Sequence, residues 1–111
     1  MKFMTIDEIP GRVPPQHYDL LGRVVADESL GVKAFKVSYT RMEKTGRCDP
    51  HVHANGEQLF IVLKGAMMFV SKEGERPLRQ GQAVLVLRGE EHSNYNMADD
   101  ITEYITVTGT S

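Results

Sequence analysis

Two histidines separated by one residue, His51 and His53, give this sequence its clearest chemical potential. On a β-strand, residues i and i+2 project from the same face, so the two imidazoles can aim at one point. A third histidine, His92, lies in a later segment bounded by turn-forming residues. Three imidazoles and one polar side chain are a common ligand set for a mononuclear transition-metal site. We therefore expect one divalent metal ion per chain, and these ligand types do not distinguish Mn, Fe, Ni and Zn.

The histidines belong to two longer patterns, at residues 46–65 and residues 81–96. The positions that define them are Gly46, His51, His53 and Gly65 in the first, and Gly81, Gly89, His92 and Asn96 in the second. In order and spacing these patterns resemble the two signature motifs of the cupin superfamily, with Leu87 where a proline is usual. The resemblance covers about half of the chain. It implies an all-β cupin, or jelly-roll, β-barrel (a double-stranded β-helix) that holds one metal through three histidines and a carboxylate or amide.

The rest of the chain fits a single all-β domain spanning residues 1–111. Short apolar runs alternate with turn signals, as in sandwiches and barrels. Prolines in residues 1–19 leave room for no more than one helical turn, so we expect an extended amino-terminal arm there. The expected strands are Leu20–Ala26, Gly31–Met42, Gln58–Leu63, Ala66–Val70, Ala83–Leu87 and Ile101–Thr108.

Two neighbouring residues, Glu57 and Gln58, compete for the fourth ligand position. Counted from His53, Glu57 keeps the commoner cupin gap, as in pirin-like members. Counted back from Gly65, Gln58 keeps it, as in the small cupins that ketonise unsaturated uronates. Strand register is fixed by the hydrogen-bond ladder, whereas loop length varies at little cost. We therefore favour His51, His53, His92 and Gln58 as the metal ligands and keep Glu57 as the alternative.

Candidate substrate-contacting and catalytic residues lie on two of the expected strands. Arg41 continues the face of Phe35, Val37 and Tyr39, so it is a candidate to clamp a carboxylate at the barrel mouth. The alternative, which we favour slightly, is an arginine at a strand end that reaches solvent. Glu57, if it is not a ligand, is a second candidate for substrate contact. Glu103 and Tyr104 occupy opposite parities of the last strand, and either one would enter the cavity as acid or base. His17 lies far from both motifs and is interpreted as a surface histidine, and Asn96 as a turn-supporting residue.

The resemblance to uronate-ketonising cupins favours a metal-dependent enzyme that acts on a small, oxygen-rich anion such as a sugar acid. Isomerisation or keto-enol proton transfer is the expected reaction. An iron-dependent dioxygenase is the second hypothesis, and a non-catalytic module that binds a carbohydrate-like small molecule is the third. These hypotheses differ in what they require: a titratable group in the cavity, oxygen consumption, or neither.

The composition limits which binding partners and which cellular compartment we expect. The net charge of −2 provides no basic face for nucleic acid. No apolar run reaches the roughly 18 residues that a membrane span needs. The single cysteine, Cys48, precludes an internal disulfide and is typical of a reducing compartment, so we expect a cytoplasmic protein. Exposed strand edges and the proline-marked arm favour a homodimer.

Overall fold

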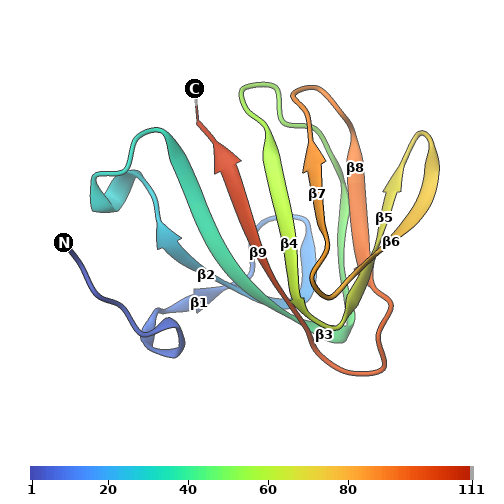
Figure 1. Cartoon of the computed structure of the whole chain (residues 1–111), viewed down its shortest axis with the longest axis horizontal. Coiled ribbons are helices and arrows are strands. Elements are labelled where there is room, and N and C mark those ends of the chain that lie inside the picture. The colour runs from blue at the N-terminus through green and yellow to red at the C-terminus, as the bar shows by residue number, and fades with distance from the viewer. Residues whose placement is uncertain (111) are drawn as a thin grey trace.

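The computed structural model describes residues 1–110, and within them every long element is a β-strand (Figure 1). Two short 3-10 turns, η1 (Ile6–Glu8) and η2 (Glu28–Leu30), are the only helical elements in this part of the chain. None of the described helices is long and apolar enough to span a membrane. The strands are β1 (Gly11–Arg12), β2 (His17–Ala26), β3 (Phe35–His51), β4 (Gln58–Lys64), β5 (Ala66–Ser71), β6 (Gly74–Arg79), β7 (Ala83–Val86), β8 (His92–Asn96) and β9 (Thr102–Gly109). The prediction of an all-β fold is confirmed.

The strands form one antiparallel sheet that curls into a nearly closed barrel. Along the sheet the order is β6-β5-β8-β3-β9-β4-β7, and β2 with the short β1 pairs along β3. A groove lined by residues of β6 and β7 marks the seam between the two end strands. The long β3 pairs with β9 over its first half and with β8 over its second, so it links the two parts of the barrel (Figure 1). β6 and β8 were not among the expected strands, because their polar residues hide the alternation.

Alternation along β3 and β9 determines what lies inside the barrel. Thr40 and Met42 are buried while Arg41 is exposed, and on β9 Thr102 and Tyr104 are buried. The inward face of β3 is therefore the opposite of the one expected from Phe35, Val37 and Tyr39. The apolar core consists of Leu20, Met42, Phe60, Val62, Met67, Phe69, Leu78, Val86 and Tyr104.

The turn that leads into β9 is organised by Asn96, as predicted. Its amide group donates to the carbonyls of Met42, Glu43 and Asp100, at 3.2, 2.9 and 2.9 Å. Its Oδ1 accepts from the Ala98 N–H and the Thr102 hydroxyl, both at 2.8 Å. This buried amide thus satisfies backbone groups that would otherwise lack partners.

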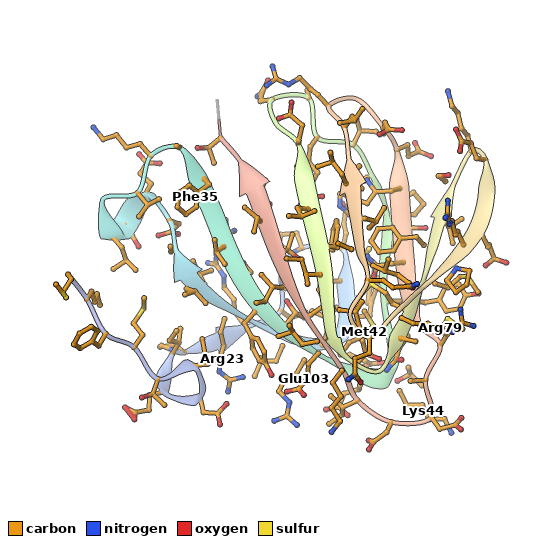
Figure 2. All side chains as sticks on the ribbon, in the orientation of Figure 1. Arg23, Phe35, Met42, Lys44, Arg79 and Glu103 are labelled. Carbon is orange, nitrogen blue, oxygen red and sulfur yellow. The ribbon has the colours of Figure 1, made fainter. Side chains whose placement is uncertain are left out.

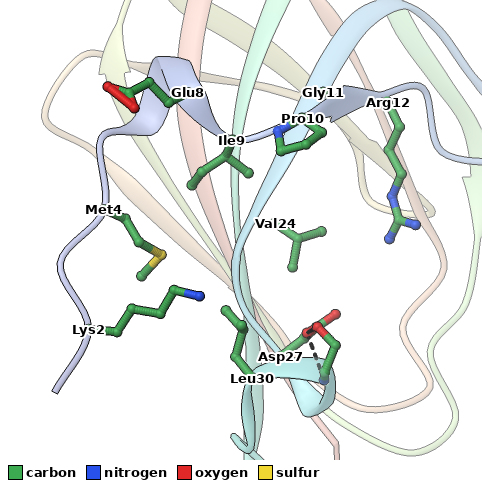
Figure 3. Close-up of a pocket in the computed structure, with 11 residues that line it drawn as sticks. Lys2, Met4, Glu8, Ile9, Pro10, Gly11, Arg12, Val24, Asp27 and Leu30 are labelled. Carbon is green, nitrogen blue, oxygen red and sulfur yellow. Dashed lines mark hydrogen bonds between the residues drawn. The ribbon is translucent and has the colours of Figure 1, made fainter.

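The amino-terminal arm lies against the outer side of β2. It makes two register pairs with that strand through β1, and Arg23 Nε donates to the Ile9 carbonyl at 3.0 Å. Figure 3 shows the groove between the arm, β2 and η2, with Met4, Val24 and Leu30 among its lining residues. Because β2 already begins at His17, the arm ends sooner than the predicted residue 19.

Candidate metal centre

Three histidines converge where the end of β3 meets the start of β8. His51 is the last residue of β3 and pairs in register with His92, the first residue of β8. His53 follows in the loop after β3. Their ring nitrogens offer three ligand atoms that lie within 4.8 Å of one another. Because one ion can reach all three nitrogens, the group fits a metal site, although His53 is presented by a loop and not by a strand.

Backbone contacts orient two of the three rings. Nδ1 of His51 donates to the Asp49 carbonyl at 3.0 Å, and Nδ1 of His92 donates to the Glu90 carbonyl at 3.2 Å. A carbonyl oxygen only accepts, so Nδ1 carries the proton and Nε2 is left free to bind a metal. Burial lowers the pKa of His92 and of His53. Both rings are thus favoured in the neutral form that a metal requires.

Gln58, not Glu57, points at the histidines. Gln58 is buried at the start of β4, its Oε1 lies 3.0 Å from His92 Nε2, and its amide nitrogen donates to Thr108 Oγ1 at 3.1 Å. The Glu57 side chain is half exposed and forms an ion pair with Arg88 at 3.7 Å. The donor set facing one point is therefore three imidazole nitrogens and one amide oxygen, a neutral set that suits a divalent transition metal.

The loop before Gln58 is closed by a tight backbone approach at Gly56. A Cβ atom at this position would lie 2.1 Å from the carbonyl oxygen of Gly109, a contact that no larger residue tolerates. The Gly109 N–H in turn donates to the Glu57 carbonyl at 2.9 Å. The two gap counts, from His53 and from Gly65, differ by one residue. The loop before β4 accommodates this residue, and the register of β4 is preserved.

A cavity of about 350 Å³ adjoins the site, and its lining includes His51, His53 and Gln58. One wall presents hydroxyl groups from β3 and β9, and Lys36 is the only lysine or arginine among the described lining residues. No carboxylate occurs among them. The lining consists of Pro14, Pro15, Gln16, His17, Leu20, Lys36, Ser38, Thr40, His51, Val52, His53, Gln58, Phe60, Asn94, Tyr104, Thr106 and Thr108.

Three predicted residues, Arg41, Glu57 and Glu103, are not among the lining residues of this cavity. Glu103 accepts a hydrogen bond from the Tyr39 hydroxyl and lies 3.8 Å from Arg41 Nε. Figure 2 labels Glu103 towards the lower end of the barrel, close to the Met42 label. Arg41 is therefore exposed on β3 and Glu103 faces away from the cavity, because the even-numbered residues of β3 and β9 face inward. Tyr104, the alternative on β9, is 3 % exposed and lines the cavity.

Three cavity residues were missed or misread from the sequence. His17 lines the cavity with its ring centroid 5.9 Å from that of His51, so its interpretation as a surface histidine is wrong. Asn94 is buried two residues after His92, at a spacing that places both side chains on one face of β8. Lys36 shares its parity with Ser38 and Thr40, and this polar alternation was the available signal.

The match to known proteins agrees with this geometry. The sequence profile of the cupin domain matches residues 38–108, which contain all three histidines, Gln58 and both motifs. The chain is a cupin. The polyketide cyclase RemF from Streptomyces resistomycificus superposes with a TM-score of 0.89 at 21 % identity, covering 100 % of this chain and 80 % of that one.

Two further solved cupins have similar folds. A cupin-superfamily sugar phosphate isomerase from Silicibacter pomeroyi gives a TM-score of 0.85 at 19 % identity, over 99 % of this chain and 76 % of its own. KdgF from Halomonas sp. gives 0.82 at 19 % identity, over 99 % and 95 %. Comparison with curated proteins finds no match. At these identities the likeness establishes the fold alone.

Proposed function

We propose that this cupin is a metal-dependent enzyme that acts on a small, oxygen-rich anion such as a sugar acid, by isomerisation or keto-enol proton transfer. The observation that carries the proposal is the chemistry of the cavity lining. Hydroxyl and amide groups, one lysine and no carboxylate among the described lining residues surround the neutral donor set. A cavity of this kind favours a ligand that has both negative charge and hydroxyl groups.

The charge balance makes an anion the favoured ligand. Three neutral imidazoles and the Gln58 amide leave the two positive charges of a divalent ion without a counter-charge from the protein. Lys36 adds a further positive charge at the cavity wall. A divalent ion bound here would supply Lewis-acid polarisation of a substrate carbonyl. A carboxylate ligand at position 57 would have removed half of this excess, but Glu57 points to Arg88.

Tyr104 is the residue we propose as the proton carrier. Its side chain is 3 % exposed at the cavity, and burial strongly raises the pKa of its phenol. At neutral pH the phenol is therefore protonated and can donate to a substrate oxygen or to an enol carbon. Keto-enol conversion moves one proton between the oxygen and the carbon next to the carbonyl carbon, so the proton that the phenol delivers to that carbon is replaced from the enol hydroxyl. The reaction needs no oxidant.

The descriptions of two similar structures support the proposed reaction class. One is described as a sugar phosphate isomerase and another is KdgF. The broad fold class also contains other chemistries, such as the predicted oxalate decarboxylase from Thermotoga maritima. The proposal therefore depends on the cavity of this chain and not on its neighbours.

Hydrogen-deuterium exchange tests the proposed reaction. Protein purified without a metal-affinity tag is first analysed for metal, then incubated in D₂O with a 3-deoxy-2-oxo sugar acid and followed by proton NMR. We expect exchange at the carbon next to the carbonyl, a loss of at least tenfold in Tyr104→Phe with metal content retained, and no exchange in His92→Ala. Glu103→Gln, outside the cavity, is the matched control and should exchange normally. Exchange no faster than with free metal contradicts the proposal, and oxygen uptake in that case favours the dioxygenase.

A further inference from the structure

We infer that Asn94 and His17 recognise hydroxyl groups of the ligand, an inference that rests on the proposed function and specifies its substrate class as a polyhydroxylated acid. Both residues line the cavity beside the metal centre, and neither belongs to the metal-binding set. Among the described residues, Asn94 Oδ1 accepts no hydrogen bond, and the hydrogen bond of the His17 ring is made by Nδ1, not by Nε2. Two such acceptors complement the hydroxyl donors of a sugar-like chain.

Asn94 provides the stronger observation. Its side chain is 3 % exposed, and its Oδ1 is buried without a hydrogen-bond partner, alone among the buried side-chain polar atoms that the structure describes. It lies two residues after His92 on β8, so it projects to the same face. A buried acceptor without a donor is unfavourable, so in native proteins such an atom requires a partner from the protein, a water, an ion or a ligand. A ligand hydroxyl donating to Oδ1 would meet this requirement.

His17 is held in a fixed orientation by its own segment. Its Nδ1 donates to the Pro15 carbonyl at 2.8 Å, which makes Nε2 an acceptor in the neutral ring. Two nearby residues that are not glycine, Gln16 and Asp19, have φ of 62° and 54°, in the left-handed region. The Asp49 N–H donates to the Gln16 carbonyl at 2.9 Å and ties this turn to β3. Unfavourable backbone angles that tertiary contacts maintain are typical of functional sites.

The sheet register places the two acceptors in one row. His17 pairs with Cys48 on β3, and Cys48 pairs with Asn94 on β8. Directly paired residues share a face, so all three side chains point to the same side, and the outer two are two strand spacings, about 10 Å, apart at the backbone. A ligand several carbons long spans this distance more readily than a two-carbon acid. Lys36 lies on the hydroxyl-bearing wall, where its charge also acts on Asp27.

Calorimetric titration of the metal-loaded protein with gluconate and hexanoate tests the inference. The two acids have the same length and charge but differ in five hydroxyl groups. We expect wild type to bind gluconate at least tenfold more tightly than hexanoate. Asn94→Leu and His17→Phe should each reduce this preference at least threefold, with unchanged metal content and unchanged affinity for hexanoate. Ser93→Ala, at the neighbouring position on the other face of β8, is the matched control and should keep the full preference.

Thermal unfolding of the metal-free protein separates a binding role for Asn94 from a structural one. Because the acceptor lacks a partner, Asn94→Leu should unfold at the same temperature as wild type or higher. A lower unfolding temperature together with an unchanged gluconate preference overturns the inference for Asn94, and an unchanged preference in His17→Phe overturns it for His17. If wild type binds both acids equally, the inference is wrong while the anion site stands. If it binds neither, the proposed function fails as well.

Discussion

Replacing Gln58 with glutamate tests the charge balance of the metal centre most directly. The two side chains have nearly the same shape, so the carboxylate can occupy the place where the amide oxygen lies 3.0 Å from His92 Nε2. The contact with Thr108 also survives, because its hydroxyl can donate to the carboxylate. The substitution therefore adds one negative charge to the donor set with little change in packing. It should strengthen metal binding and weaken the binding of anions to the metal-loaded protein.

The size of this effect follows from the spacing of the donor atoms. The histidine ligand atoms lie within 4.8 Å of one another, so an anionic oxygen on the same ion would sit roughly 4 Å from the new carboxylate. Two unit charges at about 4 Å repel by about 4 kcal/mol at an effective dielectric constant of about 20. With up to half of this lost to relaxation and water, about 2–4 kcal/mol remains. At 1.4 kcal/mol per factor of ten, this corresponds to a loss of roughly 30- to 1,000-fold in affinity.

The assay compares galacturonate with galactose, an acid and a neutral sugar of similar shape, by calorimetry on wild type and Gln58→Glu. The galacturonate affinity should fall by the factor given above, and galactose should change less than threefold. Raising the salt concentration should reduce the difference only modestly, because the charges are enclosed. Glu57→Gln, which alters a half-exposed residue paired with Arg88, is the control and should leave galacturonate binding unchanged. An equal effect on acid and sugar would refute the charge argument.

Other predictions concern metal, assembly and pH. Elemental analysis should find near one divalent ion per chain in wild type and a small fraction of that in single alanine variants of the three histidines. Gln58→Ala should weaken metal binding at least tenfold more than Glu57→Ala. Full metal content in the triple histidine variant would place the site elsewhere. Light scattering at micromolar concentration should give a homodimer, since Met1 and Phe3 of the arm are largely exposed, and a mass near 12.5 kDa would exclude it. Burial and the Glu103 contact raise the pKa of Tyr39 to about 12, from an ordinary 10.0, so the proton-bound form stabilises the fold below pH 10 and this contribution is lost as the pH rises through 12. Chemical denaturation should therefore show stability falling over that range, and an equal slope in Tyr39→Phe would contradict the assignment.

The fold and the cluster of three histidines were predictable because they depend on local spacing. The His51-x-His53 step and the glycines around it are read directly from the sequence, and the strand-register argument favoured Gln58, whose side chain does face the histidines. The glycine at position 65 shows the same link between sequence and backbone, because its φ of 84° and its contact with Thr102 leave no room for a side chain.

The residues that line the cavity were not predictable in the same way, because the side chains that face inward there are polar. Alternation assigns the apolar side of a strand to the core, and on β3 this rule selected the face of Phe35 and Val37. In a barrel with a wet cavity at one end, the inward positions there carry hydroxyl groups such as those of Ser38 and Thr106. His17 was missed for a different reason: it reaches the site through pairing of β2 with β3, a contact between residues 31 positions apart.

The close contact between Gly56 and the Gly109 carbonyl separates the loop before Gly56 from strand β4 after it, so the two segments can change independently. Upstream of it, residues 54 and 55 form part of the loop that follows His53. Downstream, Gln58 is fixed by pairing with Val86 and Thr108. Because the glycine anchors the loop before β4 begins, an insertion or deletion at 54–55 alters the loop without moving Gln58. Libraries that vary this loop in length and composition, with Gly56 retained, would therefore change the surroundings of His53 while the amide of Gln58 stays in place.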